Sequence, residues 1–184
     1  GVKARCIDQD GELVGDEYPT ERRYATHFEN RYKEHIEGDG IGFVRTAIAR
    51  QYPFPDLDGV RYIPESTVWG RIAADGFVSY CTNERLGLYF HNEYDRDDQL
   101  TQADTTENSP AFFIYHKTRL NDHIDWFLKN PKPFFVSAAA YTMHGLNSNR
   151  SFVEMWNGLS GLQQRALWIM ALPVGYLTYR FRGT

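Results

Sequence analysis

The sequence predicts an α/β fold, with a mixed sheet and short helices over residues 1–100 followed by a helical subdomain over residues 101–184. Up to about residue 100, short runs of β-branched and aromatic residues alternate with breaks containing Gly and Pro, a pattern typical of strands and short helices. From residue 110 onward, apolar residues recur at three- and four-residue spacing, which predicts amphipathic helices. Because 42% of the 184 residues are hydrophobic and 15% are aromatic, the chain can bury a substantial core.

The first part of the chain reads as strands separated by a charged segment. Residues 2–16 predict two short strands joined at Gln9–Gly11, where Asp-Gly supplies the turn. The charged and aromatic stretch Thr20–Glu37 predicts a helix that leads to a new strand. A strand that enters a short helix is predicted over residues 42–50, and two prolines directly after it prevent the helix from continuing.

The middle of the chain contains the clearest local helix signal. Residues 60–63 are strand-like, and a proline ends them. Ser66–Ala74 has apolar residues on one helical face, and Asp-Gly follows it as a terminator. Residues 77–82 and 85–91 predict two paired strands, and the polar stretch 92–109 predicts a loop or a linker.

Three helices are predicted in the C-terminal subdomain: Ala111–Lys129, Phe134–Leu146 and Leu159–Leu172. The longest uncharged apolar run is Ala166–Tyr179. It is short for a membrane span, and a proline and a glycine interrupt it. We therefore expect a soluble chain.

Charge is distributed unevenly, because residues 1–115 carry 12 Lys/Arg and 21 Asp/Glu, whereas residues 116–184 carry 8 and 3. The acidic first part argues against a nucleic-acid-binding protein, which needs a clustered basic face. The basic remainder indicates an anionic partner or an ordinary solvated surface. Cys6 and Cys81 have no Cys or His at metal-ligand spacing, so we expect reduced core residues and a cytosolic compartment.

Glu65 is placed where a carboxylate can act as a catalytic base. It precedes a helix whose first turn has unsatisfied N–H groups and a partial positive charge, which keep a carboxylate ionised. An ionised carboxylate can take a proton from an alcohol. The alternative interpretation is simple charge complementarity at the helix start, with Ser66 as the cap.

Residues 37–89, EGDGIGFVRTAIARQYPFPDLDGVRYIPESTVWGRIAADGFVSYCTNERLGLY, resemble the second half of the catalytic domain of family 2 glycosyltransferases with a GT-A fold. The shared order is a Gly-Asp segment, an Arg-bearing strand, Phe-Pro, Pro-Glu-Ser with a Trp, and a strand ending in Leu-x-x-Tyr. The resemblance covers roughly residues 1–95. The segment LWIMALPVGYLTYR also resembles the C-terminus of a bacterial subgroup. The resemblance thus implies a partial GT-A-like sheet.

The resemblance implies a hexosyltransferase-type enzyme that transfers sugar with inversion from a nucleotide-sugar donor to a hydroxyl on a saccharide or lipid-linked acceptor. It places the enzyme in polysaccharide or cell-surface glycan synthesis, in the cytoplasm or peripherally at the inner face of the membrane. The family usually has Glu-Asp at the acceptor-site helix, with the Asp as base. This chain has Glu65-Ser66 instead, so either Glu65 takes that role or the base lies elsewhere.

The same resemblance implies further substrate-binding residues. Gly38 and Asp39 would lie near the acceptor pocket, although an Asp in a glycine turn is common without any ligand. Arg45 would contact phosphate, or pair with a neighbouring carboxylate. Trp69 would stack on a sugar, or belong to the core. Tyr89 closes the Leu-x-x-Tyr strand and is assigned to substrate binding.

The resemblance also implies a divalent cation, Mn or Mg, held by an Asp-x-Asp motif after a nucleotide-binding half that precedes this chain. The letters Asp8–Asp10 match the motif, but they fall in the predicted hairpin turn. His91 is placed where some relatives contact metal or diphosphate, and an exposed polar His is the alternative. We expect the chain without its N-terminal half to be inactive. The C-terminal helices would pack on the core or rest on an anionic membrane surface.

Two other functions remain open. A non-catalytic module that binds saccharide or assembles with a partner would keep the fold and lack the donor site. A hydrolase would use Glu65 with a second carboxylate such as Asp39 and would release free sugar without an acceptor.

Overall fold

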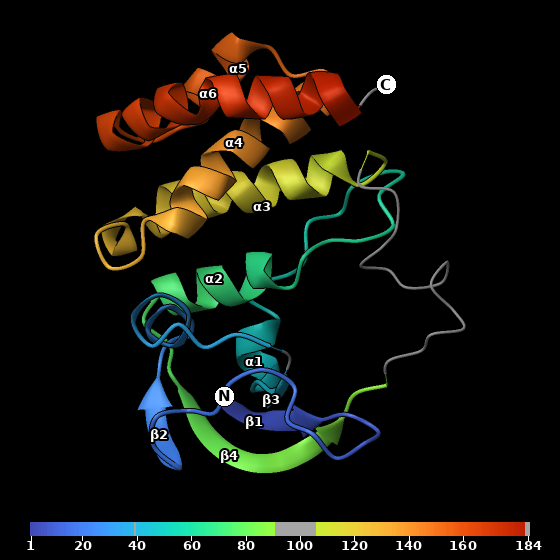
Figure 1. The fold of residues 1–184 in the computed structure, drawn as a ribbon, viewed down its shortest axis with the longest axis vertical. Coiled ribbons are helices and arrows are strands. Elements are labelled where there is room, and N and C mark those ends of the chain that lie inside the picture. The colour runs from blue at the N-terminus through green and yellow to red at the C-terminus, as the bar shows by residue number, and fades with distance from the viewer. Residues whose placement is uncertain (39, 91–105, 183–184) are drawn as a thin grey trace. The chain divides into compact units, whose positions relative to one another are not determined.

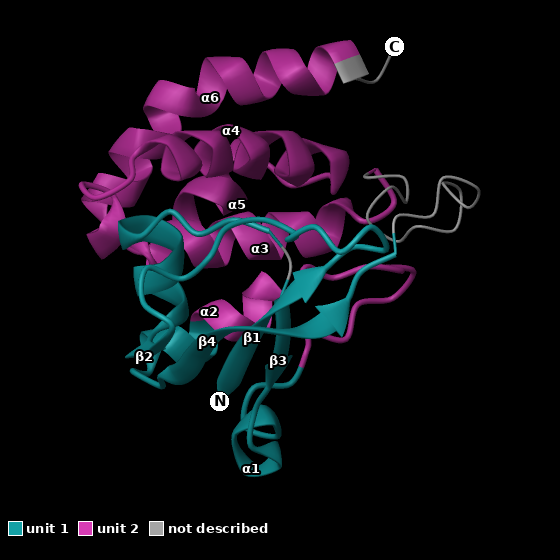
Figure 2. Ribbon diagram, turned by 60° about the horizontal axis from the view of Figure 1, so that its bottom comes forward, with its two compact units in different colours: residues 1–53, 71–96 teal, residues 54–70, 97–184 magenta. Residues whose placement is uncertain are grey.

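The computed structural model of the chain describes residues 1–38, 40–90 and 106–182. The chain separates into two compact units (Figure 2). Unit 1 comprises residues 1–53 and 71–96, and unit 2 comprises residues 54–70 and 97–184. Residues 54–70 therefore group with the helical part of the chain, although the sequence assigns them to the first predicted domain.

Unit 1 is built on a four-stranded mixed sheet, labelled in Figure 1, with the strand order β2-β4-β1-β3. The strands are β1 (Val2–Ile7), β2 (Arg22–Ala25), β3 (Gly40–Phe43) and β4 (Ser79–Leu88). Strand β1 runs parallel to β4 and antiparallel to β3, and β2 pairs antiparallel with β4. The predicted α/β class, a mixed sheet followed by helices, is confirmed.

Strand β4 corrects the predicted pair of strands over residues 77–91. One continuous strand replaces the pair, because β4 has neighbours on both edges and needs no hairpin partner of its own. Asn83, which lies between the two predicted strands, does not form a turn. Its side-chain amide instead accepts from the Tyr18 N–H at 2.7 Å and donates to the Tyr18 carbonyl at 3.0 Å.

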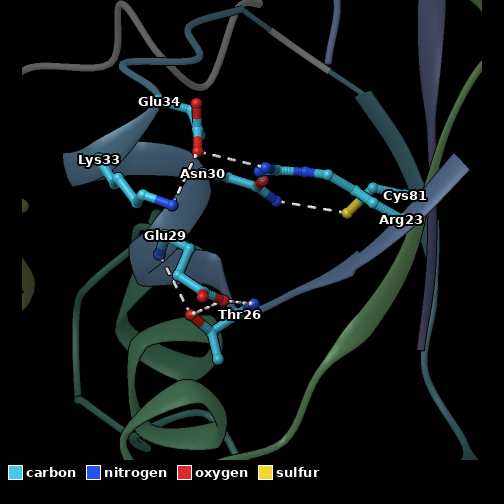
Figure 3. A network of polar contacts seen from close by, with 7 residues as sticks. All are labelled: Arg23, Thr26, Glu29, Asn30, Lys33, Glu34 and Cys81. Carbon is cyan, nitrogen blue, oxygen red and sulfur yellow. Dashed lines mark hydrogen bonds and ion pairs between the residues drawn. The ribbon is translucent and has the colours of Figure 1, made fainter. Parts of the chain in front are cut away.

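The predicted helix Thr20–Glu37 is wrong in its first half. The structure has strand β2 there, followed by the short π-helix η1 (Glu29–Lys33). Figure 3 shows the side chains that hold this turn against the sheet. Asn30 donates to the buried Sγ of Cys81 at 3.3 Å, and Arg23 pairs with Glu34 at 3.3 Å. Pairing of β2 with the distant strand β4 therefore overrides the local helix propensity.

Two further strand predictions are wrong. The second arm of the first hairpin is reduced to a single bridge between Ile7 and Leu13. The Asp8 carboxylate accepts from the N–H groups of Asp10 and Glu12, each at 2.9 Å, and thereby closes the turn locally. Residues 60–63 form no strand, because their backbone bonds to a side chain rather than to a sheet edge.

The two short helices α1 and α2 are as predicted. Strand β3 leads into α1 (Thr46–Ala49), and α2 spans Ser66–Ala74 as its sequence pattern indicates. Helix α2 ends at Gly76, which has φ +81° and donates its N–H to the Ala73 carbonyl at 3.0 Å.

The regular secondary structure of unit 2 is helical among the residues that the structure describes. It contains α3 (Ser109–Asp122), the 3-10 turn η4 (Ile124–Trp126), α4 (Lys132–Asn147), α5 (Phe152–Asn157) and α6 (Leu162–Arg182). Helix α5 was not predicted; Ser151 and Glu154 form a capping box at its start. Helix α6 continues past Pro173, where the sequence predicts an end. The proline side chain is exposed and leaves the packing of α6 on its neighbours intact.

The core of unit 2 lies between α3, α4 and α6. Phe134, Ala138 and Tyr141 of α4 are fully buried, and the ring of Tyr141 stacks on Phe113 with centroids 4.6 Å apart. Trp168 of α6 donates its Nε1–H to the Thr142 hydroxyl at 2.9 Å. Among the described residues, no helix has the length and apolar character needed to cross a membrane. Both cysteines of the chain, which lie in unit 1, are buried and free, as expected.

Candidate functional site

Glu65 stands at the start of α2, where the sequence places it. Its carbonyl accepts the first helical hydrogen bonds, from the N–H groups of Val68 at 2.9 Å and Trp69 at 3.1 Å. Its carboxylate is exposed, and Oε2 receives the indole Nε1–H of Trp69 at 3.4 Å. Ser66, the alternative cap, is the first residue of the helix. The structure thus brings together two of the predicted site residues, a solvent-facing carboxylate and a half-buried indole.

The segment before Glu65 is fastened to α3 by a buried amide. Asn108 is 1% exposed, and its Oδ1 accepts from the backbone N–H of Arg61 at 2.9 Å and of Tyr62 at 3.0 Å. The ring of Tyr62 lies 6.0 Å from that of Phe112. One side-chain oxygen therefore replaces the sheet edge that residues 60–63 would otherwise need.

A second contact fixes the first turns of α2 within the same unit. A Cβ built on Gly70 would lie 2.6 Å from Nε2 of His123, whose ring is 3% exposed. The absence of a side chain at Gly70 therefore lets the helix backbone approach a buried imidazole. Together, the Asn108 and His123 contacts fix the backbone that carries Glu65 and Trp69. We call these contacts the backbone clamp.

Replacing Asn108 by Ala should loosen the backbone clamp. Two backbone N–H groups lose their acceptor, which costs about 2 kcal/mol of stability. In hydrogen exchange, we expect the Arg61 and Tyr62 amides to lose protection before the core amides of α4. Asn157→Ala, at an exposed helix end, should leave both amides protected. Unchanged protection in Asn108→Ala would show that the clamp does not depend on this side chain.

The remaining predicted site residues that the structure describes belong to unit 1, where their contacts are made through the backbone. Gly38 has φ +88°, and a Cβ there would lie 2.4 Å from the Cα of Gly15, so both loops need glycine at this crossing. Arg45 is exposed, and its carbonyl accepts the first bonds of α1. Tyr89 donates its N–H to the Ile7 carbonyl at 2.7 Å and extends the pairing of β4. Asp39 and His91 lie outside the described residues.

The crossing at Gly38 is reinforced by Arg5, which is 2% exposed. Its Nη2 donates to the carbonyls of Val14 at 3.0 Å and Glu37 at 3.1 Å, and its guanidinium lies 5.3 Å from the centre of the Tyr18 ring. These contacts tie together two loops that are far apart in the sequence. They give Gly38 a structural role in addition to any role in binding.

A buried polar cluster lies between α3 and α4, in a region where the sequence pattern indicates only apolar helix faces. The Ser109 hydroxyl lies 3.1 Å from Nδ1 of His144, and the His144 ring stacks on His116 with centroids 5.7 Å apart. Arg119 donates to the Ser137 hydroxyl at 3.2 Å and to the hydroxyl of Tyr115. The spacing of His116, Arg119 and His123 on one helix face was the available signal.

Burial controls the ionisation of this cluster. The pKa of His116 is well below its ordinary value, because the ring is buried and because His144 and Arg119 lie close to it. Burial, followed by Arg119, lowers the pKa of His123 to about 3. These imidazoles are neutral at pH 7, and we assign them to the packing of unit 2 rather than to acid–base chemistry.

Unit 2 also contains a cavity of about 380 Å³. Its lining combines the apolar side chains of Leu57, Pro110, Phe113 and Ile114 with the polar groups of Tyr141, Lys117 and Arg150. Glu154 also lines the cavity, and its carboxylate is bound to the α5 capping box and to Arg150, at 3.4 Å. The lining is amphipathic and includes the cationic side chains of Lys117 and Arg150.

The residues that the structure describes contain no group of three or more His, Cys, Asp or Glu side chains arranged to hold a metal ion. Comparison with family models, with curated proteins and with solved structures gave no match for this chain.

Proposed function

We propose that the chain is the acceptor-side part of an inverting glycosyltransferase with a GT-A-like catalytic domain, and that Glu65 is its base. The observation that carries the proposal is the exposed Glu65 carboxylate on the first turn of α2, beside the Trp69 indole and above a buried backbone clamp. The order of motifs from Gly38 to Tyr89, which resembles family 2 glycosyltransferases, supports the reaction class.

In the proposed reaction, the acceptor hydroxyl hydrogen-bonds to a Glu65 carboxylate oxygen. As the acceptor oxygen attacks the anomeric carbon, its proton moves to Glu65 and the bond between the sugar and the nucleoside diphosphate breaks. Attack on the face opposite the leaving group inverts the anomeric centre. Trp69 would hold the acceptor ring by stacking, and its N–H orients the carboxylate.

Glu65→Gln in the full-length protein should test this role. The amide cannot take a proton, so we expect kcat for transfer to fall at least about 100-fold. The dissociation constant for the nucleotide sugar should stay unchanged. Glu107→Gln, at another exposed carboxylate, is the matched control and should keep full activity. Release of nucleoside diphosphate from a panel of nucleotide sugars provides the readout.

Three results would contradict the proposal in different ways. Normal turnover by Glu65→Gln would place the base elsewhere. Saccharide binding without transfer by the full-length protein would identify a binding module. Release of free sugar without an acceptor would identify a hydrolase.

A further inference from the structure

Helix α6 has two apolar faces, and the described structure covers only one of them. Its inner face packs on α4, and the five buried positions recur at helical spacing: Gln164, Leu167, Trp168, Ala171 and Gly175. The opposite face is exposed and also apolar. The large side chains on it, 53–79% exposed, are Leu162, Ile169, Met170, Val174, Leu177 and Phe181.

Few polar residues interrupt this outer face. Among the exposed positions of α6 whose side chains are described, only Gln163 and Arg180 are polar. A surface helix of a globular protein normally presents a charged face to water, so an apolar outer face marks an interaction surface. We call this surface the α6 outer face.

The charged residues near the α6 outer face indicate the kind of partner that binds it. Residues 126–184 contain six Lys/Arg and one acidic residue, Glu154. That carboxylate is already bound to the Ser151 cap and to Arg150. Arg165 and Arg180, both on α6, form no ion pair with any described residue, and the guanidinium of Arg165 rests on the ring of Trp156, 5.0 Å from its centre.

We infer that the α6 outer face docks on an anionic lipid surface, with α6 lying in the plane of the interface. The apolar side chains would enter the boundary between headgroups and acyl chains, and the basic side chains would contact the headgroups. Pairing of two α6 helices would instead bring arginines together without a carboxylate to balance them, which disfavours a second copy of the chain. The inference does not depend on the proposed transferase activity.

Co-sedimentation with vesicles tests the inference on the full-length protein. We expect binding to phosphatidylcholine vesicles that contain phosphatidylglycerol and at least about tenfold weaker binding to pure phosphatidylcholine, since each basic residue near an anionic surface contributes about 1 kcal/mol. The double variant Met170→Glu/Leu177→Glu should lose at least about tenfold in binding, because it places two charges on the face that enters the lipid.

The matched control is Gln51→Glu/Asn157→Glu, which adds the same charge at two exposed polar positions outside α6. It should bind almost as the unmodified protein does, and circular dichroism should show both variants folded. Equal loss in the two variants would show that net charge alone drives binding and would overturn the inference. A dimer that dissociates in Met170→Glu/Leu177→Glu would assign the face to a second copy and would overturn it as well.

Discussion

Acidification from pH 7 to pH 5 is expected to lower the free energy of unfolding of unit 2 by about 2 kcal/mol through His123 alone. Burial, followed by the nearby guanidinium of Arg119, lowers the pKa of this imidazole from 6.5 to about 3. The folded protein therefore keeps the ring neutral at pH 5, whereas the unfolded chain protonates it below pH 6.5. The unfolded state binds more protons, so stability decreases as the pH falls from 6.5 towards 3.

His116 acts in the same direction. Its pKa is also lowered, by burial and by the nearness of His144 on α4 and Arg119 on α3. Carboxylates whose pKa is lowered in the fold, Glu29 and Glu154, stabilise the protein above pH 4.5 and lose this effect only at lower pH. Between pH 7 and pH 5, the change in the free energy of unfolding therefore comes from the histidines and not from these carboxylates.

Urea unfolding followed by the tryptophan fluorescence of unit 2 at several pH values measures the slope of the free energy of unfolding against pH. His123→Asn removes the titrating ring, so its stability should vary less with pH even though the absolute stability is lower. His35→Asn is the matched control: His35 is exposed and has φ +54°, which Asn tolerates. The control should keep the slope of the unmodified protein. An unchanged slope in His123→Asn would mean that this ring titrates alike in the folded and unfolded states.

Local sequence signals predicted helix α2 well. Ser66–Ala74 has its apolar face and its Asp-Gly terminator within one stretch of chain, and the observed helix has the same bounds. The strands could not be placed in this way, because β2 and β4 are defined by each other and by β1 rather than by their own residues. Long-range pairing converted a charged segment that resembles a helix into strand β2.

The same distinction between local and long-range contacts applies to the candidate site. Glu65 and Trp69 are one helical turn apart, so their proximity follows from the sequence once the helix is recognised. The clamp beneath them could not be read from the sequence, because Asn108 follows a long polar stretch and bonds to backbone groups of a segment predicted to be a strand. The buried histidines were missed for a related reason, since their burial depends on how α3 packs against α4.

The substitution Gly175→Ala should destabilise unit 2 by about 3 kcal/mol, although the same change in an open helix would stabilise by about 1 kcal/mol. A Cβ at this position would lie 2.3 Å from the Ala139 carbonyl oxygen and 2.7 Å from Cβ of Thr142. Both neighbours belong to α4, and the nearer one is backbone. Relief therefore requires α6 to move away from α4.

Separation of the two helices would weaken other contacts, including the hydrogen bond from Trp168 to Thr142 and the packing of Trp168 near Tyr141. Thermal unfolding followed by circular dichroism measures the net effect, and steric overlap should outweigh helix propensity. Ala166→Gly, at an exposed position of α6, serves as the reference and should cost only the propensity difference of about 1 kcal/mol. Stabilisation by Gly175→Ala would show that α6 can shift on α4 at little cost, and that the close contact with Ala139 does not fix the helix.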